Sequence, residues 1–100
     1  DYIYAVIAPA STLPGCGETT DSPTGDVVAD GTISTIAHEQ FESVTDPLLD
    51  GWYADSTLSY NDEIGDICDN VQEQAVELSN NHSYVIQPMW SNLENGCVFQ

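Results

Sequence analysis

The chain has 100 residues, of which 17 are aspartate or glutamate and none is lysine or arginine, so its formal charge is −17. The lack of lysine and arginine excludes nucleic-acid binding through phosphate contacts, and it excludes docking on anionic lipid through a basic patch. The length fits one small domain or a piece of a larger one, and no apolar run reaches the roughly 20 residues of a membrane-spanning helix. We therefore expect no nucleic-acid partner and no membrane insertion.

The carboxylates have few cationic partners within the chain. Apart from the amino terminus, only His38 and His82 can pair with them. At neutral pH the repulsion among carboxylates destabilises a compact state. An acidic medium, bound metal cations or a second chain with basic residues would relieve this repulsion, and all three fit an extracellular protein better than a cytosolic one. A solvated surface remains the ordinary role of most individual acids.

The three cysteines are Cys16, Cys68 and Cys97. If two of them pair in an oxidising compartment, the third is either a free thiol or bonded to another polypeptide. Their spacing contains no CxxC pair, which disfavours a structural zinc site of the finger type. The odd thiol suggests that part of a larger covalent unit lies elsewhere.

The first expected element is a strand at residues 2–8, which are rich in β-branched and aromatic side chains and end at Pro9. Because nearly every position is apolar, this strand is expected to be buried on both faces and to need neighbouring strands. Residues 10–30 hold much of the proline, glycine, serine and threonine, so they are predicted to form a loop.

A helix is predicted from about Gly31, with Asp30 as its cap, to about Thr45, just before the Asp46-Pro47 break. Apolar side chains fall within one arc of roughly 140°, which is the expected core face. They are Ile33, Ile36, Ala37, Phe41 and Val44. An adjoining stripe carries one imidazole and three carboxylates, from His38, Glu39, Glu42 and Asp46.

The second half of the chain is predicted to be rich in turns up to residue 67, with an acidic run at residues 61–66 that is a solvated turn, a calcium loop or a source of metal ligands. A β-hairpin is predicted from residues 75–79 and 83–87, turning at Asn80-Asn81-His82. Asn81 also begins an acceptor sequence for N-glycosylation. His82 is expected to cap or decorate the turn.

Residues 38–42 read HExxE. On a helix, His38 and Glu42 stand one turn apart and can bind the same metal ion, while Glu39 can take a proton from a metal-bound water. Carboxylates bind zinc at about 2 Å, so a glutamate can replace the second histidine of the HExxH pattern. The sequence therefore predicts Zn²⁺ at this helix, with Ca²⁺ as an alternative, and Glu39 as a candidate general base.

The third metal ligand is expected from Asp46 on the same stripe, or from Glu63, which lies about twenty residues on together with Asp66. A buried strand, a long loop and then a metal helix resembles the catalytic half of zincin metallopeptidases. The expected fold class is therefore α+β: a zincin-like half-domain with a buried strand and a metal-site helix, followed by a loop-rich C-terminal part with a β-hairpin.

Several short blocks resemble the EXORDIUM-like, or phosphate-induced, family. They are GDVVADGTI at residues 25–33, VTDP at 44–47, GWY at 51–53, EIGDIC at 63–68, HSYVIQP at 82–88 and the closing Cys97. The likeness covers nearly the whole chain but corresponds to the C-terminal part of full-length members. Microbial relatives carry the His-Glu pair as this chain does, whereas plant members, known as extracellular growth-related proteins, generally lack it. The resemblance implies a secreted or cell-wall setting and a Cys68–Cys97 bridge.

These observations leave three functional hypotheses. The first is a secreted zinc peptidase with His38 and Glu42 as ligands and Glu39 as the base. The second is a non-catalytic extracellular protein, structural or signalling, and the third is a self-assembling extracellular subunit. We also expect residues 1–100 to be the C-terminal fragment of a larger unit, with a basic companion polypeptide that pairs with residues 2–8 and is linked through Cys16.

Overall fold

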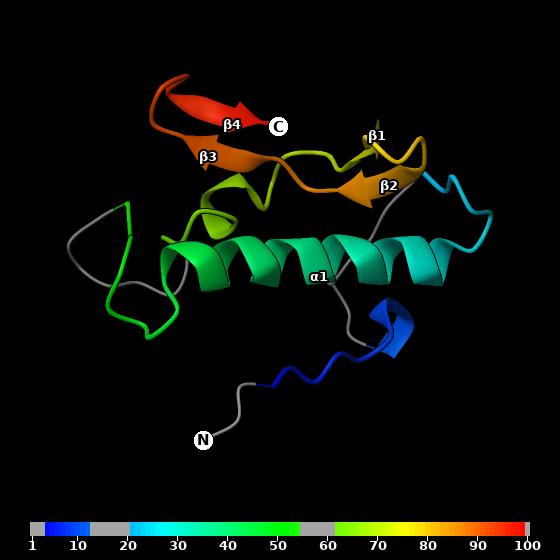
Figure 1. The fold of residues 1–100 in the computed structure, drawn as a ribbon, viewed down its shortest axis with the longest axis horizontal. Coiled ribbons are helices and arrows are strands. Elements are labelled where there is room, and N and C mark those ends of the chain that lie inside the picture. Colours follow the sequence, from blue (N-terminus) through cyan, green and yellow to red (C-terminus); the bar gives the residue numbers. More distant parts are fainter. Residues whose placement is uncertain (1–3, 13–20, 55–61, 100) are drawn as a thin grey trace.

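The computed structural model describes residues 4–12, 21–54 and 62–99 (Figure 1). One long helix, two short 3₁₀ helices and two antiparallel hairpins form these segments, which confirms the α+β class. In chain order the elements are η1 (Ala10–Thr12), α1 (Val27–Thr45), η2 (Asp66–Cys68), β1 (Gln74–Glu77), β2 (Ser83–Ile86), β3 (Met89–Ser91) and β4 (Gly96–Val98). Within the described segments, no helix has both the length and the apolar character needed to cross a membrane.

Helix α1 begins four residues before the predicted start. Its cap is Asp26, whose Oδ1 accepts hydrogen bonds from the backbone N–H groups of Val28 and Ala29, each 3.1 Å long. Asp30 was predicted as the cap but is buried in the first turn, where loop hydroxyl groups donate to its Oδ2. A carboxylate this near a helix N-terminus is favourable at either position, which explains the error. The end at Thr45 agrees with the prediction.

The prediction that the apolar arc of α1 faces the core is wrong for the described structure. The buried side of the helix carries Asp30, Gly31, Ser34 and Glu42. By contrast, Ile33, Phe41 and Val44 are 38%, 43% and 71% exposed. The reason is that the segments packed on α1 present polar groups to it: the Ser34 hydroxyl, for example, donates to Oε1 of Glu73 over 2.6 Å.

The predicted hairpin at residues 75–79 and 83–87 is confirmed, with slightly shorter strands. Strands β1 and β2 are antiparallel, with Ala75 opposite Val85, and Asn81 in the turn has the positive φ of 61° that asparagine tolerates. The second hairpin, β3–β4, was not predicted. Its signal was the Asn95-Gly96 dipeptide, a strong marker of tight hairpin turns, and Asn95 has a φ of 50°.

The segment before α1 differs from the prediction of a doubly buried strand. Residues 4–9 form no strand, and Tyr4 and Val6 are 83% and 87% exposed. None of the described strands lies beside this segment, so its backbone has no ladder to join. In Figure 1 the hairpins lie on one side of α1, whereas η1 and residues 4–9 lie on the other. Residues 2 and 3 and the predicted linking thiol Cys16 are outside the described residues.

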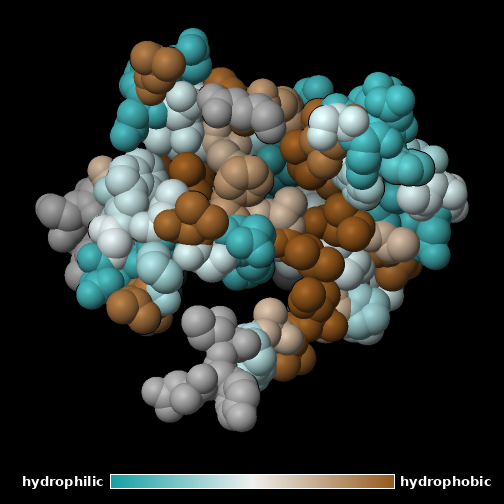
Figure 2. All heavy atoms as spheres, viewed as in Figure 1, coloured by the Kyte–Doolittle hydropathy of each residue, from teal (hydrophilic) through white to brown (hydrophobic). Residues whose placement is uncertain are grey.

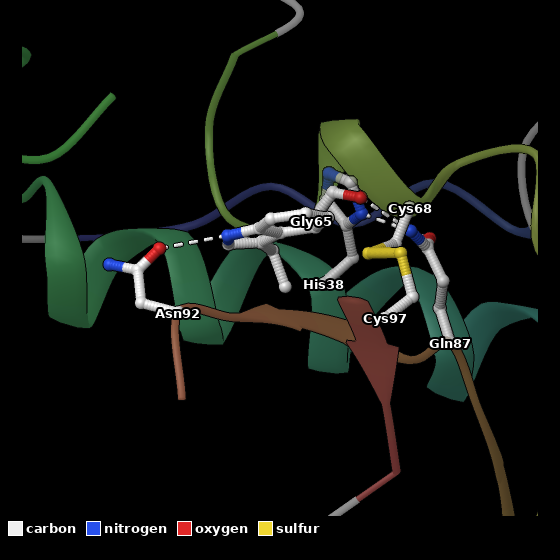
Figure 3. The surroundings of a disulfide bond; sticks show 7 residues. His38, Gly65, Cys68, Gln87, Asn92 and Cys97 are labelled. Atoms are coloured by element: carbon white, nitrogen blue, oxygen red, sulfur yellow. Dashed lines mark hydrogen bonds between the residues drawn. A yellow bond between two sulfur atoms is a disulfide. The ribbon is translucent and has the colours of Figure 1, made fainter. Parts of the chain in front are cut away.

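A disulfide bond joins η2 to the last strand, β4. The Sγ atoms of Cys68 in η2 and Cys97 in β4 are 2.06 Å apart, as the family resemblance implies (Figure 3). Cys68 is fully buried and belongs to a small apolar core with Val85 and Met89. The bridge therefore anchors η2, which carries Asp66, against the C-terminal hairpin.

Candidate metal site

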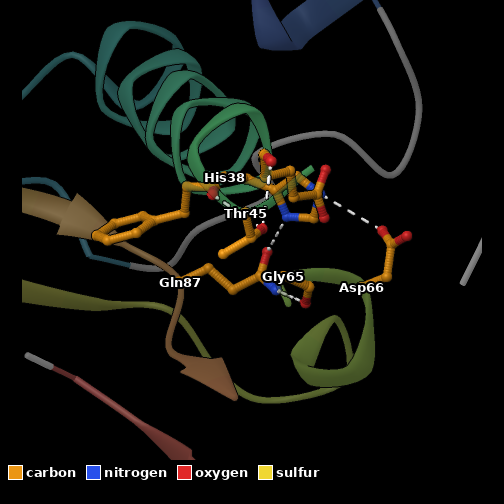
Figure 4. Close-up of polar contacts among 7 residues, drawn as sticks. His38, Thr45, Gly65, Asp66 and Gln87 are labelled. Atoms are coloured by element: carbon orange, nitrogen blue, oxygen red, sulfur yellow. Dashed lines mark hydrogen bonds and ion pairs between the residues drawn. The ribbon is translucent and has the colours of Figure 1, made fainter. Parts of the chain in front are cut away.

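Three side chains meet between α1 and η2. His38 and Glu42 lie one helical turn apart on α1, and Asp66 is the first residue of η2 (Figure 4). Nε2 of His38 lies 3.0 Å from Oε1 of Glu42 and 3.4 Å from Oδ1 of Asp66. One potential ligand atom from each residue lies within 4.8 Å of the other two, a spacing suited to one metal ion.

Gln87, which follows β2, fixes the orientation of the His38 ring. Its side-chain Nε2 donates a 2.7 Å hydrogen bond to the carbonyl oxygen of Gly65, so Oε1 is the atom that faces Nδ1 of His38, 3.1 Å away. Because an amide oxygen only accepts hydrogen bonds, Nδ1 carries the proton. The other ring nitrogen, Nε2, faces the two carboxylates, and in the neutral ring its lone pair is available for a cation.

Gly65 allows the loop to approach the histidine closely. A Cβ atom at this position would lie 2.7 Å from Nδ1 of His38 and 2.9 Å from Oε1 of Glu42. Real Cβ atoms do not come this near to other heavy atoms, so any side chain at position 65 would displace the loop or the ligand pair. Glycine is therefore needed at position 65 because no side chain fits beside His38 and Glu42, and not because of its backbone dihedral angles.

The two carboxylates beside His38 favour a positive charge at the site. Glu42 is buried, and its Oε1 receives no aligned hydrogen bond within the described part of the chain. The adjacent Glu42 carboxylate raises the pKa of His38 to about 9, against the opposing effect of burial. Burial and the charge of Glu42 also raise the pKa of Asp66. A proton on His38 or a divalent cation would satisfy the same buried oxygen.

The predicted third ligands occupy different surroundings. Oδ1 of Asp46 accepts hydrogen bonds from the backbone N–H groups of Asp50 and Gly51, 2.7 and 2.6 Å long, and so caps the turn after α1. The neighbouring Tyr53 hydroxyl holds the pKa of Asp46 below its usual range, and Asp46 in turn raises the pKa of Tyr53 to about 12. Asp46 is thus engaged in organising a turn.

Glu63 lies near the group without being one of its three members. Burial raises its pKa, and the charges of Glu42 and Asp66 raise it further, as does that of Asp46. The structure therefore brings Asp66, rather than Asp46 or Glu63, against His38 and Glu42. The sequence signal for Asp66 was its place directly after Gly65, where a side chain on a close-packed loop can reach the helix.

The remaining predicted positions lie on the surface. Glu39 is exposed on α1 and is not one of the three grouped residues. Asn81 and His82 are exposed in the β1–β2 turn, so the acceptor asparagine is accessible, and glycosylation there stays a prediction.

The donor set fits a divalent metal ion. One imidazole nitrogen and two carboxylate oxygens are common ligands of Zn²⁺ and of other first-row divalent ions, whereas Ca²⁺ takes six to eight oxygens. The buried Oε1 of Glu42 makes no aligned hydrogen bond in the described part of the chain, and it lies close to Nε2 of His38, so both atoms are placed to bind an ion between them.

Comparisons with known proteins identify the family. The family model described as the phosphate-induced protein 1 conserved region matches residues 10–76, which include His38, Glu42 and Asp66. The chain is 34% identical to Protein EXORDIUM-like 3 of Arabidopsis thaliana over 113 aligned residues, which cover 95% of this chain and 33% of that relative. It is 41% identical to Protein EXORDIUM-like 5 of the same plant over 49 residues, covering 49% of this chain and 14% of the relative.

The chain thus spans about a third of the length of EXORDIUM-like 3. No solved structure matches the chain, so a relation to zincin folds has no structural support from this comparison. The family match extends over two thirds of the sequence and agrees with the resemblance of its short blocks. The chain belongs to the phosphate-induced protein 1, or EXORDIUM-like, family.

Proposed function

We propose that this chain is a non-catalytic, metal-binding part of an extracellular EXORDIUM-like protein, in which a divalent ion joins α1 to η2. The observation that carries the proposal is the buried Oε1 of Glu42, which makes no aligned hydrogen bond in the described part of the chain and lies 3.0 Å from Nε2 of His38. A cation among the three ligands would replace carboxylate repulsion with attraction between two segments 24 residues apart.

Zn²⁺ is the proposed ion. Structural zinc sites usually hold four ligands, so one further donor is needed beside His38, Glu42 and Asp66. Glu63 is the proposed fourth ligand, because it lies three residues before Asp66 on the segment that faces His38 and Glu42. Asp46 is a poorer choice, since its Oδ1 already accepts two backbone hydrogen bonds.

The extracellular setting is supported by the disulfide between Cys68 and Cys97. Structural disulfides persist in oxidising compartments and are rare in the cytosol. A chain without lysine or arginine also gains from external cations, which are the counter-charges that it cannot supply itself.

A zinc peptidase of zincin-like arrangement is the second candidate, and the HExxE spacing is the feature that favours it. In that case Glu39 would activate a water bound to the metal. The exposure of Glu39 to solvent supports the non-catalytic proposal instead.

Metal analysis of the native protein, followed by titration of chelated protein with Zn²⁺, tests the proposal. We expect Zn²⁺ to raise the melting temperature of the wild type and of Glu39→Gln, but not of Glu42→Gln, and we expect no casein hydrolysis by any of them. A wild type that Zn²⁺ does not stabilise would contradict metal binding. Hydrolysis that disappears in Glu39→Gln would instead establish the peptidase.

A further inference from the structure

The β1–β2 hairpin ends in a turn that holds Asn81 in the left-handed region of backbone conformation. The backbone N–H of Leu78 donates to the carbonyl oxygen of His82, and that of Asn81 donates to the carbonyl oxygen of Leu78, each over 2.9 Å. Together with the φ of 61° at Asn81, these bonds form a common connection between antiparallel strands. Asparagine tolerates this conformation and glycine adopts it freely, so the backbone alone can account for an asparagine at position 81.

The backbone does not account for the difference between the side chains of Asn80 and Asn81. Nδ2 of Asn80 donates to the Tyr84 hydroxyl, and Oδ1 of Asn80 accepts a hydrogen bond from the backbone N–H of His82, each 3.0 Å long. The Asn80 carboxamide therefore holds the turn in place. Among the described residues, the exposed Asn81 carboxamide has no hydrogen-bond partner. Its amide nitrogen is thus accessible, and its modification breaks no hydrogen bond within these segments.

The two residues that follow Asn81 complete an acceptor sequence for N-glycosylation. This sequence requires an asparagine, any residue except proline, and then serine or threonine, and here it is Asn81-His82-Ser83. Ser83 is the first residue of β2, so the required hydroxyl group lies directly beside the turn. Asn80 begins no such sequence, because the residue two positions after it is His82. The acceptor sequence and the accessible amide therefore coincide at Asn81.

We propose that Asn81 carries an N-linked oligosaccharide. This proposal rests on the extracellular setting of the proposed function and not on the metal ion. The donor is an oligosaccharide on a polyprenyl diphosphate, which an oligosaccharyltransferase of the secretory route uses. Nδ2 of Asn81 forms a bond to the anomeric carbon of the first sugar, while the bond from that carbon to the diphosphate oxygen breaks. The polyprenyl diphosphate leaves with the electron pair of the broken bond, and the proton lost from Nδ2 passes to a base of the transferase.

The turn is well placed to carry a bulky group. In Figure 1 it lies near the N-terminal end of α1, whereas η2 lies toward the other end of the helix. Figure 2, in the same view, shows mainly hydrophilic surface, in teal, at this end of the hairpin. Within the described segments the β1–β2 sheet has two strands, so each strand has one unpaired edge. A polar oligosaccharide at the turn hinders the pairing of these edges with other chains, and it leaves the metal site open.

Peptide mapping of the native protein tests the assignment without any substitution. The chain has no lysine or arginine for trypsin to cut at, but a glutamate-specific protease cuts after Glu77 and Glu94 and releases residues 78–94. Peptide N-glycosidase in heavy-oxygen water converts a glycosylated asparagine to an aspartate that carries the heavy oxygen. We expect this label at Asn81 and not at Asn80 of the same peptide.

A set of variants separates the modification from the structure of the turn, each secreted as the full native chain from a eukaryotic host. Asn81→Gly suits the positive φ and should lose the oligosaccharide, and Ser83→Ala should lose it although Asn81 is kept. Asn80→Ala is the matched control: it removes the hydrogen bonds to Tyr84 and His82 and should keep the oligosaccharide. Ser83→Thr should also keep it, because threonine serves equally in the acceptor sequence.

Extracellular native protein with an unmodified Asn81 would overturn the inference, and so would a label at Asn80 or an oligosaccharide that persists in Ser83→Ala. Native protein confined to the cytosol would contradict the extracellular setting as well. Titration with Zn²⁺ before and after enzymatic removal of the oligosaccharide separates this inference from the metal proposal. We expect the same rise in melting temperature in both forms, because the turn lies away from η2. A protein that Zn²⁺ stabilises in neither form would contradict the metal site and leave the assignment of Asn81 intact.

Discussion

Gln87 holds His38 in one tautomer, because its amide is itself held by the carbonyl group of Gly65. Oε1 lies 3.1 Å from Nδ1 of the histidine, and the amide nitrogen donates over 2.7 Å to the glycine. Gln87 is buried, so the amide cannot exchange these partners for water without local opening. Residues that orient a metal-binding histidine in this way support affinity without touching the ion.

Replacement of Gln87 by leucine should therefore weaken Zn²⁺ binding by about 10- to 100-fold, because Nδ1 loses the acceptor that keeps Nε2 free for the metal. Gln74→Leu, at an exposed position in β1, is the matched control and should bind as the wild type does. Calorimetric titration of the chelated proteins measures both constants. Equal affinities in the two variants would show that Gln87 has no role in orienting the ligand.

Gly65→Ala should impair both folding and metal binding. The added Cβ would lie 2.7 to 2.9 Å from atoms of His38 and Glu42, so the η2 loop or the ligand pair has to move. Overpacking of this kind costs about 1–3 kcal/mol. In Gly96→Ala the new Cβ would lie 3.9 Å from the carbonyl oxygen of Glu94, an ordinary contact, and this control should keep the wild-type melting temperature and affinity.

The sequence was enough to predict that His38 and Glu42 meet on one helix. It was not enough to predict which residues from other elements meet them. His38 and Glu42 meet because any α-helix brings residues i and i+4 together, so their 3.0 Å approach needs only local structure. Asp66 and Gln87 arrive from η2 and from the end of β2, and their positions depend on tertiary packing. Sequence spacing alone therefore offered Asp46 and Glu63 as the third ligand, with Asp66 close by in sequence, and could not choose among them.

For a similar reason, the sequence could not show which face of α1 packs against the rest of the described chain. Periodicity reports which side chains are apolar, and it assigns Ile33, Phe41 and Val44 to one face correctly. It cannot report which face the neighbouring segments of this chain cover. The described segments contact the polar face, where the Ser34 hydroxyl donates to Glu73, and they leave Ile33 and Val44 exposed. The β1–β2 hairpin was predictable because its asparagine turn is a local signal.

The disulfide should contribute strongly to the stability of this small chain. Cys68 and Cys97 are 29 residues apart, and closing a loop of that length stabilises the folded state by about 3–4 kcal/mol in the chain-entropy description. Cys68→Ala with Cys97→Ala should lose this amount, as measured by urea unfolding. The wild type under reducing conditions should match the double variant, and a reduced wild type that keeps its full stability would contradict the prediction.

The chelated protein should lose stability as the pH rises from about 5 to about 9. The Glu42 carboxylate raises the pKa of His38 from 6.5 to about 9, so the stabilisation is complete below 6.5 and is lost as the pH passes through 9. Burial raises the pKa of Asp66, Glu63 and Glu73, so these groups also make the folded state less stable as the pH rises through the acidic end of the range. The folded state binds more protons than the unfolded state throughout this window.

Two groups have the opposite sign, but they act below the window. The pKa of Asp46 is lowered by Tyr53, and hydrogen bonds from Ser22 and Thr24 lower that of Asp30 despite burial, so both contributions to stability are lost only as the pH falls below about 4.

Melting temperatures of the chelated wild type and of His38→Gln, measured across this pH range, isolate the contribution of the histidine. The variant should lose the slope between neutral pH and about 9, because it has no imidazole to titrate. With Zn²⁺ bound, the wild type should reverse its slope below neutral pH, since protons compete with the metal for its ligands. A melting temperature of the chelated wild type that climbs with pH would contradict the charge assignment of the site.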